Sequence, residues 1–149
     1  MRTLGRYREA ADLHERTLTD CERFLGPDHP GTLASRNNLA HALNDLGHHQ
    51  EAAGLHQRTL TDYERVLGPD HPSTLTSRNN LARTLHELGR HEEAVALNQQ
   101  TLTDYERVLG PDHPDTLTSR NNLARALNAA ARSQRWRRPW RRTRSSPAR

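Results

Sequence analysis

Apolar residues recur along this chain with the spacing of a helix face. Between residues 31 and 46, Leu39, Leu43 and Leu46 fall at positions i, i+4 and i+7, with Ala40 beside them. This spacing places the four side chains in one apolar stripe of an α-helix. Gly47 follows the last of them, and a glycine at that point is a common helix end. The pattern therefore predicts a helix over residues 31–46.

A second helix is predicted after this one, and the dipeptide Gly68-Pro69 ends it. Asp70 is then the expected N-cap of the following helix, with Pro72 accommodated in its first turn. The same reading of the whole chain predicts an all-α protein with helices at residues 6–24, 31–46, 49–66, 73–88, 91–108 and 115–130.

Comparison of the chain with itself shows a tandem repeat. The hexapeptide LGPDHP begins at Leu25, Leu67 and Leu109, at intervals of 42 residues. Residues 58–85 and 100–127 are identical at 25 of 28 aligned positions. Each unit contains a helix A, a tight turn, a helix B and a loop bracketed by prolines. The units are therefore expected to stack as antiparallel hairpins in an α-solenoid.

The repeat resembles a known family. The run Asn-Asn-Leu-Ala-x-x-Leu-x-x-Leu-Gly-x-x-x-Glu-Ala, at residues 37–52 and 79–94, is followed by Val-Leu-Gly-Pro-Asp-His-Pro. This run is similar to the 42-residue tetratricopeptide repeats of kinesin light chains and of many bacterial proteins. The resemblance covers residues 1–130 and implies a right-handed solenoid that binds other proteins. Four positions differ from the general pattern of such repeats: Arg36 and Arg78 replace Trp, Ala40 and Ala82 replace Gly, Leu43 and Leu85 replace Tyr, and His56 and Asn98 replace Phe.

The repeat pattern is incomplete at both ends. Residues 4–10 align with residues 46–52, and the register fails after Leu127, where Ala130 and Ala131 replace the expected Leu-Gly. The predicted organisation is two full hairpins between two half-repeats, with bounds of 1–130 for the array and 131–149 for a disordered tail rich in Arg and Trp.

Both terminal helices are expected to expose apolar side chains that the repeat pattern would otherwise cover. Arrays of this kind close their ends with polar capping helices, and an exposed apolar strip favours a partner surface. We therefore predict head-to-tail self-association. The residues concerned are Leu13, Leu18, Phe24 and Leu25 in the first helix and Leu117, Leu123 and Leu127 in the last.

Polar residues on the face of helix A opposite the leucine stripe are the candidate binding residues. Stacked hairpins would align them as ladders along a concave surface. Asn can bond the backbone of an extended peptide, and Arg attracts carboxylates. We predict an interaction module or scaffold that binds an extended acidic peptide. The alternative is that the amides only bond neighbouring helices and the arginines are solvated. The candidates are Asn37, His41, Asn44, Asn79, Arg83, His86, Asn121, Arg125 and Asn128.

The positive charge of the chain is concentrated in its last residues. Residues 132–149 carry eight of the 22 arginines and no acid, so residues 1–131 have a formal charge of −4. The overall charge therefore does not favour a nucleic-acid-binding array. An alternative function is binding of nucleic acid or an anionic membrane through the segment Arg135–Arg142. A frameshift in a repeat gene would also produce such a tail, without any function.

Enzymatic function is not predicted. An Asp-His pair recurs once in each loop, at 28–29, 70–71 and 112–113. Such repetition is typical of structural residues, whereas catalysis needs a single convergent group of side chains. The chain has no HExxH, glycine-rich phosphate loop or GxSxG motif, and no histidine group with metal-ligand spacing. We expect no cofactor and no metal.

Cys21 is the only cysteine, so the chain cannot form an internal disulfide, and a reducing compartment fits this composition. It stands at the repeat position of Tyr63 and Tyr105, which indicates a packing role. No segment approaches the roughly 18 apolar residues that span a bilayer, and the N-terminus has no apolar signal core. We expect a cytoplasmic protein without a transmembrane segment.

Overall fold

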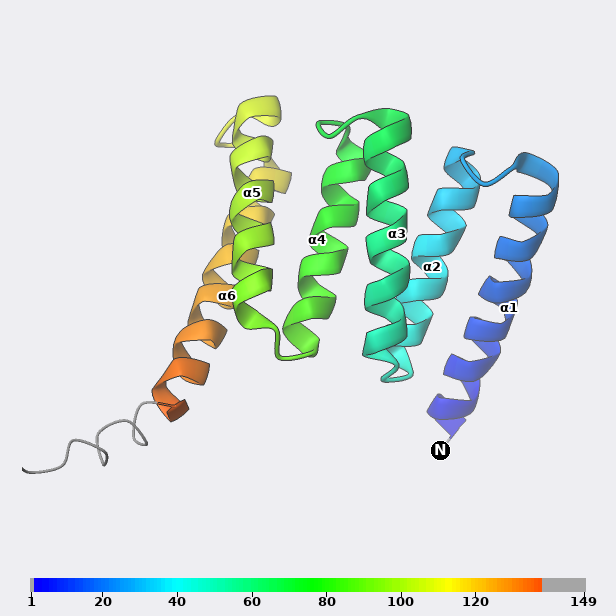
Figure 1. Ribbon diagram of the computed structural model, residues 1–149, viewed down its shortest axis with the longest axis horizontal. Coiled ribbons are helices and arrows are strands. Elements are labelled where there is room, and N and C mark those ends of the chain that lie inside the picture. The colour runs from blue at the N-terminus through cyan, green and yellow to red at the C-terminus, as the bar shows by residue number, and fades with distance from the viewer. Residues whose placement is uncertain (1, 138–149) are drawn as a thin grey trace, which may run out of the picture.

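A computed structural model describes residues 2–137 of the chain. All regular structure in this part is helical, and the helices stand side by side in a row with α1 and α6 at its ends (Figure 1). Each helix packs against the helices before and after it in sequence. The predicted all-α solenoid of helical hairpins is confirmed. The helices are α1 (Arg2–Leu25), α2 (Pro30–Asp45), α3 (His49–Leu67), α4 (Pro72–Glu87), α5 (His91–Leu109) and α6 (Pro114–Arg137).

The caps of the A-type helices correct one expectation. The sequence predicts Asp70 as the N-cap of α4, but His71 holds that position, and its ring Nδ1 accepts a hydrogen bond from the backbone N–H of Ser73 at 3.1 Å. His29 and His113 form the same cap in the other two loops, at 2.9 and 3.1 Å. The imidazole thus satisfies a free N–H of the first turn, as shorter capping side chains usually do.

Glycine conformation decides where helix A turns into helix B. Gly47 and Gly89 have φ angles of +81° and +78°, a region that residues with a β-carbon avoid. The next equivalent position is Ala131, and here the helix continues to Arg137 rather than ending at residue 130 as predicted. Residues 131–137, expected in the tail, are therefore helical. Most of the Arg135–Arg142 segment, and the rest of the expected tail, lies outside the described residues.

Small side chains allow the paired helices to approach closely. Ala40, Ala52, Ala82 and Ala94 are all fully buried. The main apolar cluster joins leucines of α3 and α4 to Ala94 of α5, with Leu97 packed against its edge. The core is thus a series of hairpin contacts rather than one central globule, which is how a repeat array is stabilised. Within residues 2–137, no helix has the length and apolarity needed to cross a bilayer.

Candidate functional site

A groove of about 480 Å³ lies between the A-type helices α4 and α6, and α5 contributes buried residues to its lining. Its lining is mostly polar, with arginine, histidine, amide, threonine and acidic side chains, and Ala82 and Ala126 are its small apolar residues. From α5 come Asn98 and Tyr105. The principal polar residues of the two walls are Asn79, Asn80, Arg83, His86 and Glu87 on α4, and Asp115, Asn122 and Arg125 on α6.

Only part of the predicted residue set reaches this groove. Of the candidates, Asn79, Arg83, His86 and Arg125 line it. Asn121 and Asn128 are exposed and lie outside the lining, where Asn122 takes the place expected for Asn121. Neighbouring side chains on a helix point about 100° apart. The packing of α6 on α5 decides which amide of the Asn-Asn pair faces the groove, and the pair itself carries no signal for this.

The ladder expected from the repeat is visible between α2 and α4. A guanidinium nitrogen of Arg83 lies 3.0 Å from Nδ1 of His41, exactly one repeat away in sequence but adjacent in space. Burial, and then the charge of Arg83, lowers the pKa of His41, although Asp45 opposes this effect. The neutral ring can accept the hydrogen bond from Arg83. Arg83 is thus oriented by His41 while its side chain stays exposed.

Other predicted amides have structural roles. The Nδ2 of Asn44 donates to the hydroxyl of Thr84 on α4 at 2.8 Å, and its Oδ1 lies 3.0 Å from Nδ1 of His49. For Asn44, therefore, the alternative interpretation holds, in which the amide bonds a neighbouring helix. Asn37 and Asn79 are half-buried rather than exposed, and the Oδ1 atom of each has no hydrogen-bond partner within the described residues.

His56 was not among the predicted site residues, but it lies directly beneath the ladder. Its ring is fully buried and meets the ring of His41 edge-on, with centroids 5.3 Å apart. Neither ring nitrogen has a hydrogen-bond partner in the described part of the chain. Burial, followed by the positive charges of His41 and Arg83, lowers the pKa of His56 to about 4. The sequence signal for its burial was its position, because the general repeat pattern has Phe there.

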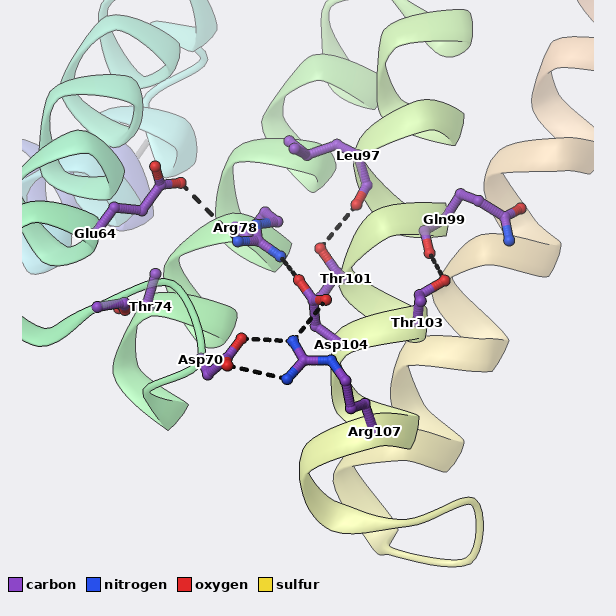
Figure 2. Close-up of polar contacts among 11 residues, drawn as sticks. Glu64, Asp70, Thr74, Arg78, Leu97, Gln99, Thr101, Thr103, Asp104 and Arg107 are labelled. Carbon is purple, nitrogen blue, oxygen red and sulfur yellow. Dashed lines mark hydrogen bonds and ion pairs between the residues drawn. The ribbon is translucent and has the colours of Figure 1, made fainter.

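The Asp-His loops carry ion pairs that hold successive helices together. Figure 2 shows Asp104 of α5 between two arginines, with Arg78 of α4 at 2.6 Å and Arg107 at 3.1 Å. Arg107 also reaches both carboxylate oxygens of Asp70 in the α3–α4 loop, at 2.6 and 3.0 Å. The hydrogen bonds from Arg107 hold the pKa of Asp70 below its usual range. Asp70 therefore clamps the loop instead of capping the helix.

The preceding repeat contains the same network. Arg36 of α2 pairs with Asp62 at 2.6 Å, and Arg65 bridges Asp62 to Asp28 at 3.2 and 2.5 Å. Recurrence in two loops supports a structural role for these acids. Within residues 2–137, no group of three or more His, Cys, Asp or Glu side chains is arranged to hold a metal ion. Cys21 is half-buried.

Comparison with known proteins adds a family to this geometry. The sequence model of the tetratricopeptide repeat family matches residues 1–31, 32–73 and 74–115. The chain belongs to the tetratricopeptide repeat family. A comparison with curated proteins gives no match.

Solved structures agree with this assignment. A Podosopora anserina protein described as a kinesin light chain with nearly identical TPR-like repeats superimposes with a TM-score of 0.79 at 34% identity, over 88% of this chain. BtubC (BKLC) from P. vanneervenii gives a TM-score of 0.77 over 97% of this chain at 21% identity, which shows a shared fold. The chain spans 62% of the length of either structure.

Proposed function

We propose that this chain is a non-enzymatic interaction module that binds an extended acidic peptide in the groove between α4 and α6. Tetratricopeptide repeats mediate protein–protein interaction. The observation that supports an acidic ligand is the pair of arginines in the groove lining, Arg83 and Arg125. Within the described residues neither of them pairs with a carboxylate.

The other charges of the groove limit where the ligand's acid can lie. Asp115 lies in the first turn of α6, and Glu87 is the last residue of α4. Because α4 and α6 run in the same direction, these acids mark opposite ends of the groove, and the two arginines lie between them. An acidic side chain at the centre of the peptide, with uncharged or basic residues on both sides, fits this order of charges.

The amides of the groove suit the backbone of an extended peptide. Asn79, Asn80 and Asn122 on the walls and Asn98 beneath them can each donate and accept hydrogen bonds. Such bonds do not depend on the side chains of the ligand. The amides would therefore supply general affinity, and the arginines would select peptides with a central acid.

Binding of a synthetic peptide library tests the proposal. Blocked peptides with a central Asp or Glu are compared with counterparts that carry Asn or Gln there, by fluorescence polarisation. The acidic peptides should bind more tightly, with affinity that falls as salt rises. Arg125→Ala should weaken this binding by about tenfold, or about 1.4 kcal/mol.

Arg58→Ala is the matched control, since Arg58 is an exposed arginine on α3 outside the groove lining. It should leave affinity unchanged. Equal binding of acidic and neutral peptides, or an equal effect of the two variants, would contradict the proposal.

A further inference from the structure

The outer face of α6 carries a guanidinium in the position where inner repeats bury an ion pair. Arg36 and Arg78 are almost wholly buried, and each bonds an Asp of the following B-type helix at 2.6 Å. Arg120 occupies the same repeat position on α6, yet it is exposed, and its guanidinium donates to the backbone oxygen of Pro111 at 3.3 Å. This face thus presents one half of a recurrent ion pair.

The outer face of α1 carries the complementary charges in the same register. Asp20 stands one repeat before Asp62, the partner of Arg36. Arg23 stands one repeat before Arg65, which in the inner repeat also clamps the loop aspartate. Within the described residues, no ion pair involves Asp20 or Arg23.

The loop before α6 completes the set of charges. Asp112 stands one repeat after Asp70, which two hydrogen bonds tie to Arg107. Asp112 is exposed and takes part in none of the ion pairs formed within residues 2–137. The α6 end therefore offers an arginine and an aspartate, and the α1 end offers an aspartate and an arginine, at matching positions of the repeat.

Apolar side chains at the two ends show the same relation. Leu75 of α4 is fully buried, whereas Leu117, its equivalent on α6, is 47% exposed. Leu85 and Leu127 differ in the same way, at 6% and 49% exposure. On α1, Leu13 is exposed, whereas Leu97 at the same position of α5 packs against the main apolar cluster. Leu18 and Leu123, expected at these surfaces, are instead buried.

We infer that a second copy of this chain docks its α1 on the outer face of α6, so that the 42-residue array continues from one copy into the next. Arg120 then pairs with Asp20 of the second copy, and Asp112 pairs with Arg23 of the second copy, as in the network of Figure 2. Leu13 of the second copy packs against Leu127, as Leu97 packs against the cluster that contains Leu85. The contact is head-to-tail, so it leaves a free end on each copy and generates open chains.

Matched register and charge together favour a second copy over an unrelated partner. The inner contacts between α2 and α3, and between α4 and α5, already join helices of these sequences in this geometry. The extension of α6 stays in contact with α5, since Gln134 donates to Glu92 at 2.9 Å.

Charge reversal in single variants and in their mixture tests the inference. Sedimentation velocity of the full chain should show an average mass that rises with concentration. Arg120→Asp places two carboxylates at the contact, and Asp20→Arg places two guanidinium groups there. Each variant alone should associate at least about tenfold more weakly, a loss of about 1.4 kcal/mol.

An equimolar mixture of the two variants should regain association. At one contact the new carboxylate at position 120 meets the new guanidinium at position 20, and at the next contact the original Arg120 and Asp20 meet. Circular dichroism checks that each variant is folded, which the exposure of both residues favours.

Two controls separate this contact from other effects. Arg58→Asp makes the same charge change on α3, away from both ends, and should leave association intact. Arg125→Ala, which tests the peptide groove, should also leave it intact. A folded wild-type chain that stays monomeric throughout the concentration series would overturn the inference and indicate that the end faces are covered otherwise. Failure of the mixture to recover association would overturn it equally.

Discussion

Replacing His56 with phenylalanine should remove a pH dependence from the stability of the array. His56 is fully buried, and burial with the nearby charges of His41 and Arg83 lowers its pKa from 6.5 to about 4. In the unfolded chain the ring titrates near its ordinary pKa of about 6.5. Between these two values the unfolded state binds a proton that the folded state does not. The free energy of unfolding therefore falls as pH falls through this window.

The size of the effect follows from the two pKa values. The difference between 6.5 and about 4 corresponds to about 3 kcal/mol. Most of this loss, about 2–3 kcal/mol, should be present at about pH 4.5. Phenylalanine has a ring of similar size and no proton to gain. It also removes two buried nitrogens without partners, each of which costs about 1–3 kcal/mol when unsatisfied. His56→Phe should thus be at least as stable as the wild type at neutral pH.

Urea unfolding followed by far-ultraviolet circular dichroism measures this dependence across the window. Wild type should lose stability steadily on acidification, and His56→Phe should lose about 2–3 kcal/mol less. His14→Phe is the matched control, because His14 occupies the same repeat position in α1 but is only half-buried. The carboxylates of Asp28 and Asp70 have lowered pKa values, so their contributions are lost only at more acidic pH. An unchanged pH slope in His56→Phe would refute the reasoning.

Five further substitutions test the packing, the ion pairs and the backbone, each by the urea-unfolding midpoint. Ala82→Leu should cost about 1–3 kcal/mol, because Ala82 is fully buried between helices. Arg78→Ala should cost about 1.5–3 kcal/mol, because half-buried Asp104 loses its bond to a buried guanidinium and keeps only its pair with Arg107, whereas Arg120→Ala, at the exposed equivalent, should cost no more than about 0.5 kcal/mol. Gly54→Ala should stabilise α3 by about 0.5–1 kcal/mol, and Gly68→Ala should destabilise, because Gly68 has a φ of +92°. Equal effects within either pair would contradict these assignments.

The repeat made much of the fold predictable from sequence. Helix positions follow from the apolar spacing of Leu39, Leu43 and Leu46, and the turn after them follows from Gly47, whose positive φ the structure confirms. Ala40, which the same spacing places in the apolar stripe, is fully buried. These features depend on local periodicity and backbone sterics, which are set within a single repeat and recur in the next one.

Other features depend on which residues meet across helices. Asp is a preferred N-cap residue, but the carboxylate of Asp70 bonds Arg107 of α5, which is distant in sequence. His71 caps the helix instead. Asn121 and Asn122 are identical side chains, and only the packing of α6 selects the second for the groove. The burial of His56 likewise depends on α2 and α4 lying above it. Sequence therefore determined the hairpin and its repetition, whereas the partners of polar side chains were decided by tertiary packing, because a hydrogen bond or an ion pair requires contact in space that local spacing does not encode.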